Sequence, residues 1–258
     1  MAAMVLGPSC VFHRDRAVTV DADASVGSSY VFRGQTMVDG PVAQGNARVG
    51  VPLAVGGAVQ LAGFANVDLT NDVGGGWFDD GHAGEFTEYD GIAAYAFDAG
   101  PLTVEAGAQY YGWPNASDFP FQPFPTTTQA FVRVGADVAG FAPSVTVFRD
   151  VDEVHGADYA QAALAREVPL AKALRLELGG SLGWSDATHS LWLYRRETDG
   201  FSDLAGRAHV AWDARDWLTV RIGAHASTIL DDTMRGWFDG KANDADVVWF
   251  TLGVAVAF

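Results

Sequence analysis

Apolar and polar residues alternate along most of this chain. In residues 18–27, valine and alanine at the even positions are separated by threonine, aspartate and serine at the odd ones. A period of two places successive side chains on opposite faces of a β-strand, so each such segment has one apolar and one polar face. Because the pattern continues to the end of the chain and helix signals are nearly absent, the sequence predicts an all-β fold.

Twelve segments carry this alternation, and many of them are ten residues or longer. Strands of globular sheets usually have ~5–6 residues, whereas strands that cross a membrane need ~9–11. The predicted strands are residues 17–34, 43–53, 59–69, 86–97, 102–110, 129–138, 143–149, 158–167, 174–184, 203–212, 218–227 and 248–258.

The predicted connections alternate in length. The six long loops hold 16 acidic and four basic residues, so most of the net charge of −16 falls on one rim. Transmembrane barrels have short periplasmic turns and long external loops, and an even number of strands places both ends of the chain on the short-turn side. The long loops are residues 35–42, 70–85, 112–127, 150–157, 186–201 and 230–245, and the short turns are residues 54–57, 98–101, 139–142, 168–173 and 213–216.

Composition excludes several classes of protein. The 258 residues include 32 acidic and 16 basic ones, and phosphate contacts need clustered Lys and Arg, so we expect no nucleic-acid partner. The single cysteine, Cys10, excludes an internal disulfide and a cysteine-based zinc site. A hydrophobic content of 49% is too high for a disordered chain. No apolar run reaches the ~18 residues that a transmembrane helix needs.

A soluble, ligand-binding β-sandwich would also alternate, so periodicity alone leaves that alternative open. Two features favour an antiparallel, up-and-down transmembrane β-barrel. The apolar faces are long and nearly uncharged, and a closed barrel leaves no unpaired sheet edge in hydrocarbon. Aromatic residues near strand ends also predict the girdles found at membrane interfaces. These aromatic residues are Tyr30, Phe32, Tyr95, Phe97, Tyr110, Trp184, Trp212 and Trp217.

The last predicted strand ends on phenylalanine, with apolar residues at every second position before it. This arrangement resembles the C-terminal signal of bacterial outer-membrane proteins, which the barrel-assembly machinery reads. The resemblance implies a bacterial outer-membrane protein, with membrane lipid and that machinery as partners. The residues of the predicted assembly signal are Phe250, Leu252, Val254, Val256 and Phe258.

Segments of the first half resemble the TorF-type (Gcw_chp) family of bacterial outer-membrane channels. Residues 28–36 (SSYVFRGQT) contain the family's YVFRG segment, and residues 40–45 (GPVAQG) resemble the strand start that follows it, although residues 42–46 depart from the family's ALQGG pattern. Residues 63–68 and 109–114 resemble later strands of the family. The resemblance covers about residues 25–115. It implies an outer-membrane, channel-like protein and does not specify a substrate.

If the apolar faces meet lipid, the polar faces line a lumen of mixed charge. Barrels of ~8 strands are filled by side chains, whereas ~16–18 strands leave an aqueous channel, so twelve strands lie between these cases. The lumen would pass small solutes or ions, and the acidic rim would concentrate cations. The alternative is a plugged barrel that acts as a structural or adhesion platform through its loops. The candidates for setting selectivity are Arg33, Arg48, Asp68, Asp90, Glu105, Arg133, Asp137, Arg175, Glu177, Arg207, His209 and Arg221.

Two of these predictions concern particular positions. Arg33 would lie at the outer end of the first strand, where it either steers anions at the mouth or pairs with a carboxylate of the wall. Pairing of Trp212 with Leu218 across the tight turn would set His209 near Arg221.

No residue pattern indicates catalysis, a cofactor or a metal site. None of the six histidines has a recognised catalytic or metal-binding spacing, and the acidic pairs at residues 79–80 and 231–232 lack the spacing of a calcium loop. We therefore predict a protein that is not an enzyme and has no cofactor. It would have one β-barrel domain at residues 17–258, after a lead or residual signal segment at residues 1–16.

Overall fold

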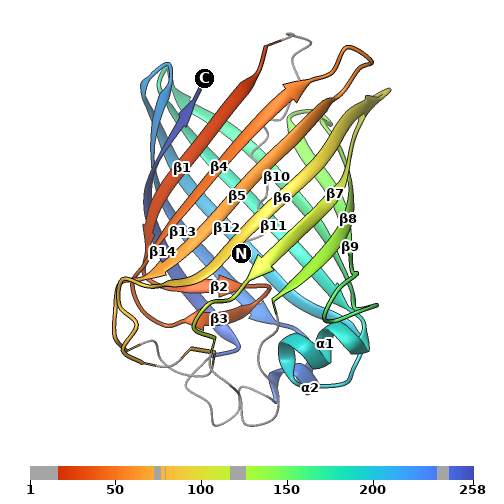
Figure 1. The fold of residues 1–258 in the computed structure, drawn as a ribbon. Helices are drawn as coiled ribbons and strands as arrows, with labels where there is room; N and C mark the ends of the chain where they lie inside the picture. The colour runs from red at the N-terminus through yellow and green to blue at the C-terminus, as the bar shows by residue number, and fades with distance from the viewer. Residues whose placement is uncertain (1–16, 73–76, 79, 117–125, 237–243) are drawn as a thin grey trace.

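Twelve antiparallel strands close into a barrel in the computed structural model, as predicted (Figure 1). The structure describes residues 17–72, 77–78, 80–116, 126–236 and 244–258, so the predicted lead segment lies outside the described residues. The elements in chain order are β1 (Thr19–Gly27), β2 (Tyr30–Phe32), β3 (Gln35–Val38), β4 (Val42–Pro52), β5 (Ala58–Asp68), β6 (Phe86–Ala99), β7 (Leu102–Gly112), β8 (Thr127–Ala136), β9 (Phe141–Asp150), β10 (Asp158–Ala171), β11 (Leu174–Ser185), α1 (Ala187–Tyr194), β12 (Gly200–Arg215), β13 (Leu218–Ile229), α2 (Asp232–Arg235) and β14 (Asp246–Ala257).

The order of strands around the wall follows the chain once β2 and β3 are set aside. Strand β1 pairs with β4 on one side and with β14 on the other, and this second ladder closes the cylinder. The start of β1 meets the last residue, because the Val20 backbone N–H donates to the Phe258 carbonyl at 3.0 Å. Both described ends of the chain therefore lie on the rim of the short turns, opposite the rim that carries α1 and α2 (Figure 1).

The apolar faces of the wall strands point outward. Ile222, Val248 and Phe250 are 64%, 64% and 60% exposed, and no second sheet formed by the described residues covers them. This single closed wall excludes the soluble β-sandwich that the alternation leaves open. An apolar outer surface around a closed ladder is the arrangement that hydrocarbon requires of a strand-built membrane protein.

The first wall strand is shorter than predicted. It ends at Gly27, and the chain then turns inward to form the separate β2–β3 hairpin. Figure 1 shows this hairpin crossing the barrel at the end that carries the helices. We call residues 28–38 the plug. Tyr30 and Phe32 are each 1% exposed within it, so the prediction that they belong to an interfacial girdle is wrong.

The hydrophobic core of this protein lies inside the barrel, around the plug. Phe32 packs edge-on against Tyr111 of β7 and Trp113, with ring centroids 5.9 Å and 5.4 Å apart. Helix α1 contributes Trp192 and Leu193 to the same cluster. The outer half of the lumen is therefore packed like the interior of a globular domain, a feature that the alternating pattern of the wall does not predict.

Both described helices lie in long loops. Helix α1 begins after Asp186, whose side chain accepts a hydrogen bond from the His189 backbone N–H at 2.7 Å. Such N-caps satisfy a backbone donor that the first helical turn leaves unpaired. None of the described helices is long and apolar enough to cross a membrane.

A glycine is required at the corner of the plug. Gly34 has φ +83°, and a Cβ atom there would come within 2.6 Å of Ile229 Cδ1 and 2.8 Å of the Asp203 Cβ. Gly34→Ala should therefore cost roughly 1–2 kcal/mol for the left-handed backbone and about 1–3 kcal/mol for overpacking. We expect faster amide hydrogen exchange across residues 28–38, measured by mass spectrometry. Gly56→Ala is the matched control, because Gly56 has φ +98° with nothing within 4 Å. Equal protection of the plug in both variants would contradict this prediction.

Candidate functional site

Arg33 lies inside the barrel rather than at its mouth. Its side chain is buried, and its Nη2 donates to the Gln129 Oε1 at 2.8 Å and to the Tyr111 hydroxyl at 3.2 Å. Its Nη1 lies 2.5 Å from the His189 Nε2. No carboxylate of the described chain is within ion-pair distance of Arg33. Both predicted roles for this residue are wrong, because the chain leaves the wall at Gly27, before it reaches Arg33.

Aromatic rings surround the Arg33 guanidinium. Its Cζ lies 4.0 Å from the centroid of Tyr159, and three more rings approach it from the plug and from the wall. Cation–π contacts of this kind contribute about 2 kcal/mol or more each when they are desolvated. They replace part of the hydration that the guanidinium gives up. The other three rings are Phe32 at 5.1 Å, Tyr111 at 5.9 Å and Phe148 at 5.0 Å.

His189, in its neutral form, is a further hydrogen-bond partner of the Arg33 guanidinium. Because a guanidinium only donates hydrogen bonds, the Nε2 of His189 must be the acceptor, and the proton sits on Nδ1. That proton then points to the Ser185 Oγ, 2.9 Å away. Burial, and next the charge of Arg33, lower the pKa of His189 well below its ordinary value. Ser185 and His189 are both 0% exposed, and no carboxylate among the described residues orients the ring, so this pair lacks the features of a catalytic Ser–His pair.

Two backbone contacts fix the plug to helix α1. The Tyr194 hydroxyl donates to the Arg33 carbonyl at 2.7 Å, and the Gln35 side-chain amide donates to the Leu193 carbonyl. Buried polar groups with such partners avoid the desolvation penalty of unpaired ones. The hairpin and the helix therefore hold each other inside the barrel.

Four acidic side chains face the plug from the wall, and each accepts hydrogen bonds from neutral donors. Such donors lower the cost of burying carboxyl groups away from water. Of the predicted lumen residues, Asp68 and Asp90 belong to this buried set rather than to an open passage. The donors are Thr87 to Asp68 at 3.3 Å, Tyr30 to Glu88, Gln109 to Asp90 at 3.1 Å, and Ser202 to Asp203 at 2.8 Å.

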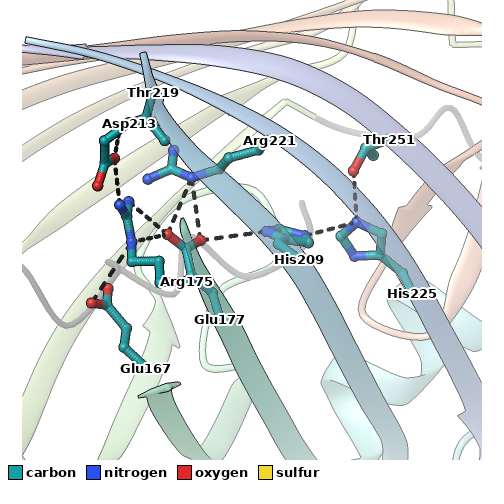
Figure 2. Close-up of polar contacts among 9 residues, drawn as sticks. All are labelled: Glu167, Arg175, Glu177, His209, Asp213, Thr219, Arg221, His225 and Thr251. Atoms are coloured by element: carbon teal, nitrogen blue, oxygen red, sulfur yellow. Dashed lines mark hydrogen bonds and ion pairs between the residues drawn. The ribbon is translucent and has the colours of Figure 1, made fainter. Parts of the chain in front are cut away.

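Charged side chains from β11, β12 and β13 form a network in the inner half of the lumen (Figure 2). Glu177 is at its centre, with its carboxylate 2.9 Å from the Arg175 Nη2 and 3.2 Å from the Arg221 Nε. The His209 Nδ1 lies 3.7 Å from the same carboxylate. Arg175 also reaches Asp213 at 2.5 Å. Four predicted lumen residues therefore meet at one point: Arg175, Glu177, His209 and Arg221.

The network continues across β13 to β14. The Nε2 atoms of His209 and His225 are 3.2 Å apart, and the His225 Nε2 lies 3.0 Å from the Thr251 Oγ1 (Figure 2). A chain of polar side chains therefore runs along this side of the lumen from the turn rim toward the plug.

The register between β12 and β13 differs from the predicted one. Trp212 pairs with Val220 instead of Leu218, because the turn is shorter than predicted and contains two residues. A shift of two positions keeps every side chain on its predicted face. His209 and Arg221 are therefore not cross-strand partners, but both still contact Glu177.

The remaining predicted lumen residues have three different surroundings. Glu105 and Arg133 are cross-strand partners on β7 and β8, and Arg48 of β4 lies opposite Asp21 of β1. Asp137 is not a lumen residue: β8 ends before it, and it lies exposed in the β8–β9 turn, where it accepts a backbone hydrogen bond. Arg207 lines a pocket beneath the plug, together with residues of five strands.

Several acids of the long loops have local structural roles. Asp231 caps α2 through the backbone N–H groups of Thr233 and Met234, as Asp186 caps α1. Asp150 accepts two backbone hydrogen bonds of its own loop. Part of the negative charge that the sequence places on this rim therefore organises the loops. Among the described residues, no group of three or more potential ligands could hold a metal ion.

The fold is similar to those of solved outer-membrane proteins. The COG4313 outer membrane channel from Pseudomonas putida F1 aligns with a TM-score of 0.58 and 8% identity, over 98% of this chain and 100% of that chain. The KdgM porin and the NanC porin align with TM-scores of 0.48 at 7% and 10% identity, each over 93% of this chain and 99% of that chain. No family model and no curated protein matches the sequence. At these identities the likeness extends to the fold, which is that of an outer-membrane β-barrel, and the TorF-type relationship stays a prediction.

The alternating pattern predicts neither the plug nor α1, although the sequence contains signals for both. The alternation stops at Gly27, where two serines follow, and an Arg-Gly pair ends the next apolar segment. An aspartate at residue 186, directly before the segment ATHSLWLY at residues 187–194, is an N-cap pattern. His189 is one of six histidines, and no sequence pattern connects it to Arg33.

The low pKa of His189 makes the plug sensitive to acid. A histidine whose folded pKa is lowered contributes stability above its unfolded pKa of about 6.5, and that contribution is lost as the pH falls below this value. We expect the amides of residues 28–38 to be less protected from hydrogen exchange at pH 5 than at pH 7.5, once the rates are corrected for the pH dependence of intrinsic amide exchange. The comparison with His189→Asn isolates this residue, because the variant should have weaker protection at pH 7.5 and a smaller response to acid. An equal response in both proteins would contradict the assignment.

Glu177 should be the most costly member of the inner network to neutralise. Glu177→Gln leaves two guanidinium groups without their shared carboxylate, and hydrogen bonds to charged groups contribute about 1.5–3 kcal/mol each. We expect a loss of that order in the free energy of unfolding, measured by urea titration in lipid vesicles. Glu167→Gln is the control, since Glu167 lies 3.8 Å from Arg175 and is more exposed. A larger loss for the control would place the centre of the network elsewhere.

Proposed function

We propose that the protein is an outer-membrane channel for small polar or charged solutes, and that its plug holds it closed in this conformation. The observation that carries this proposal is the contrast between the two halves of the lumen. In the inner half, the side chains of Arg175 and Arg221 are 21% and 32% exposed, although they point into the barrel. In the outer half, the core residues around the plug are almost completely buried.

A barrel that served only as a rigid wall would have no need of water-accessible charges within it. Charged side chains that keep contact with water line the inner half, and a pocket of about 60 Å³ lies between them and the plug. Charged side chains of both signs along a water-accessible passage allow it to select permeating solutes by their charge. The inward arginines and acids of the wall are our candidates for this selectivity.

The plug has the properties of a closure that can be released. It is a short hairpin joined at each end to a wall strand, and it carries a cation that is held by neutral groups. Burying such a charge is expensive, so the stability of the closed form depends on a few contacts around Arg33. Disruption of these contacts would favour a conformation of the plug in which water hydrates the Arg33 guanidinium.

The proposed location is the bacterial outer membrane, and the proposed partners are its lipids and the barrel-assembly machinery. The apolar band on the outside of the barrel supports contact with membrane lipid. Strand β14 supports recognition by the barrel-assembly machinery, because Phe250 and Leu252 point outward and the strand forms one side of the closing ladder. Phe258 stacks on Trp217 at 6.1 Å, near the short-turn rim.

A second candidate function is the plugged barrel that acts as a platform through its loops. The observation that favours it is the density of the outer core, in which Tyr194 and Leu193 are 0% exposed. Under this alternative the plug never leaves, and no solute crosses. The two functions therefore differ in whether weakening the plug creates a conducting state.

Planar-bilayer recording of the purified protein and of Arg33→Ala tests the proposal. We expect rare openings in the wild type and an open probability at least about tenfold higher in the variant. Such a change corresponds to about 1.4 kcal/mol, which is well below the combined contribution of the cation–π and hydrogen-bonding interactions that hold the guanidinium. Arg149→Ala is the matched control, because Arg149 pairs with Asp158 at 2.9 Å at the outer rim, away from the plug.

Absence of conductance steps in both wild type and Arg33→Ala, with both proteins shown to be folded, would reject the channel and favour the platform. Steady conductance that is equal in both would retain a channel and reject the plug as its closure.

A further inference from the structure

The outer surface of the barrel carries one arginine that has no acidic partner. Almost all side chains that face outward between the two rims are uncharged, as contact with lipid requires. At the rim of the long loops, Arg149 pairs with Asp158 at 2.9 Å, and Asp246 pairs with Arg235 of α2 at 2.6 Å. Arg166 of β10 is exposed, and no carboxylate within the described part of the chain pairs with it.

The pairing of the strands places Arg166 on the lipid-facing side. Its cross-strand neighbours are Phe141 of β9 and Leu178 of β11, whose side chains are 36% and 38% exposed. The Arg166 Cζ lies 4.4 Å from the centroid of the Phe141 ring. The next residue, Glu167, points to the opposite face, where it lies 3.8 Å from Arg175. The acid closest to Arg166 in the sequence is therefore on the other side of the wall.

The ladder between β9 and β10 gives the depth of Arg166 in the membrane. One end of this ladder is the pair Arg149 and Asp158, and the other is Arg166 opposite Phe141, the first residue of β9. At ~3.3 Å per residue and a strand tilt of ~40°, the ladder spans roughly 20 Å along the barrel axis, close to the ~25 Å height of an apolar band. Arg166 therefore lies near the headgroups at the short-turn rim. The outward residues between the two ends are all apolar: Ala160, Ala162, Leu164, Pro143, Val145 and Val147.

A guanidinium at this level needs an anion from outside the protein. An arginine on the lipid face of a barrel costs ~2–4 kcal/mol at the bilayer midplane and ~0–1 kcal/mol near the interface, where its long side chain can reach the headgroups. The Phe141 ring covers one face of the guanidinium, and no hydrogen bond within the described residues uses its donors. Those donors match two oxygens of a phosphate group at once.

We infer that Arg166 and Phe141 form a binding site on the outer surface of the barrel for the headgroup of an anionic glycerophospholipid. Arg166 donates to the headgroup phosphate, and Phe141 and Leu178 contact the upper part of the acyl chains. A zwitterionic lipid carries a headgroup cation that repels the guanidinium, so a lipid with a net negative charge is preferred. The inference deepens the proposed lipid partnership, on which it rests, and does not depend on an open lumen.

Native mass spectrometry of the folded, detergent-solubilised protein tests the inference. The probes are phosphatidylglycerol and phosphatidylcholine with identical acyl chains. We expect the first phosphatidylglycerol to bind at least about fivefold more tightly than phosphatidylcholine. This ratio corresponds to about 1 kcal/mol, which is the contribution of one basic side chain at an anionic membrane surface.

Two variants and one control locate the site. Arg166→Gln should abolish the preference for phosphatidylglycerol. Arg166→Lys should retain part of it, because an ammonium group keeps the charge but lacks the planar fork of donors. Arg149→Gln is the matched control, since it removes an outward arginine from the other end of the same ladder, where Asp158 already neutralises it, and should leave the preference unchanged.

Unfolding in vesicles separates lipid binding from a merely structural role of Arg166. Arg166→Gln should be as stable as the wild type in vesicles of phosphatidylcholine, where no anionic lipid is present. In an equal mixture of phosphatidylcholine and phosphatidylglycerol, the variant should lose the extra stability that the wild type gains. If the variant is destabilised to the same extent in both kinds of vesicle, the arginine supports the fold and the inference is wrong.

An unchanged preference for phosphatidylglycerol in folded Arg166→Gln, or an equal loss in Arg149→Gln, would also overturn the inference. If Arg166→Gln does not fold, Arg166→Lys decides, and wild-type binding of phosphatidylglycerol by that variant would contradict recognition by the guanidinium. Neither experiment needs an open pore, so these outcomes are separate from a failure of the channel.

Discussion

The structure depends on one constraint, which is that no backbone polar group of the wall can be left unpaired in hydrocarbon. Twelve strands meet this constraint by closing on themselves, and the ladder between β1 and β14 is the last element of that closure. The side chains then separate by parity: one set faces lipid and is apolar, and the other faces a space that lipid cannot reach. Everything of functional interest follows from how that enclosed space is filled.

The enclosed space is filled in two different ways. Near the long loops, the chain folds back into the barrel and builds a hydrophobic core around Tyr30 and Phe32. Near the short turns, charged side chains neutralise one another and keep contact with water. Arg33 lies between the hydrophobic core and the charged network. Its backbone belongs to the plug, and its side chain lies among the polar and aromatic groups of the wall.

Much of the wall could be predicted from the sequence, because alternation reports directly on which face of a strand meets lipid. The twelve strands, the alternating loop lengths and the inward side chains of Arg175, Glu177 and Arg221 all follow from that period. The predicted β12–β13 register is wrong, but the faces are preserved because the shift is two residues. The period carries no information about what occupies the lumen, so it predicts the start of the plug as a continuation of the first strand.

Arg33 shows why the rest of the site could not be predicted. Its partners Gln129, Tyr111 and His189 are distant in the sequence and come together only when the barrel closes. Residue type and spacing reveal that charges point inward, whereas three-dimensional contacts decide which of them remain free.

The position of the hairpin in the chain has a consequence for how the molecule is built. Residues 28–38 lie between β1 and β4, which are adjacent wall strands, so both ends of the hairpin are anchored at the same rim. Its insertion requires no threading of a free end through a finished cylinder. Because its two ends leave the wall beside each other, the hairpin can occupy the lumen without interrupting the ladder between β1 and β4.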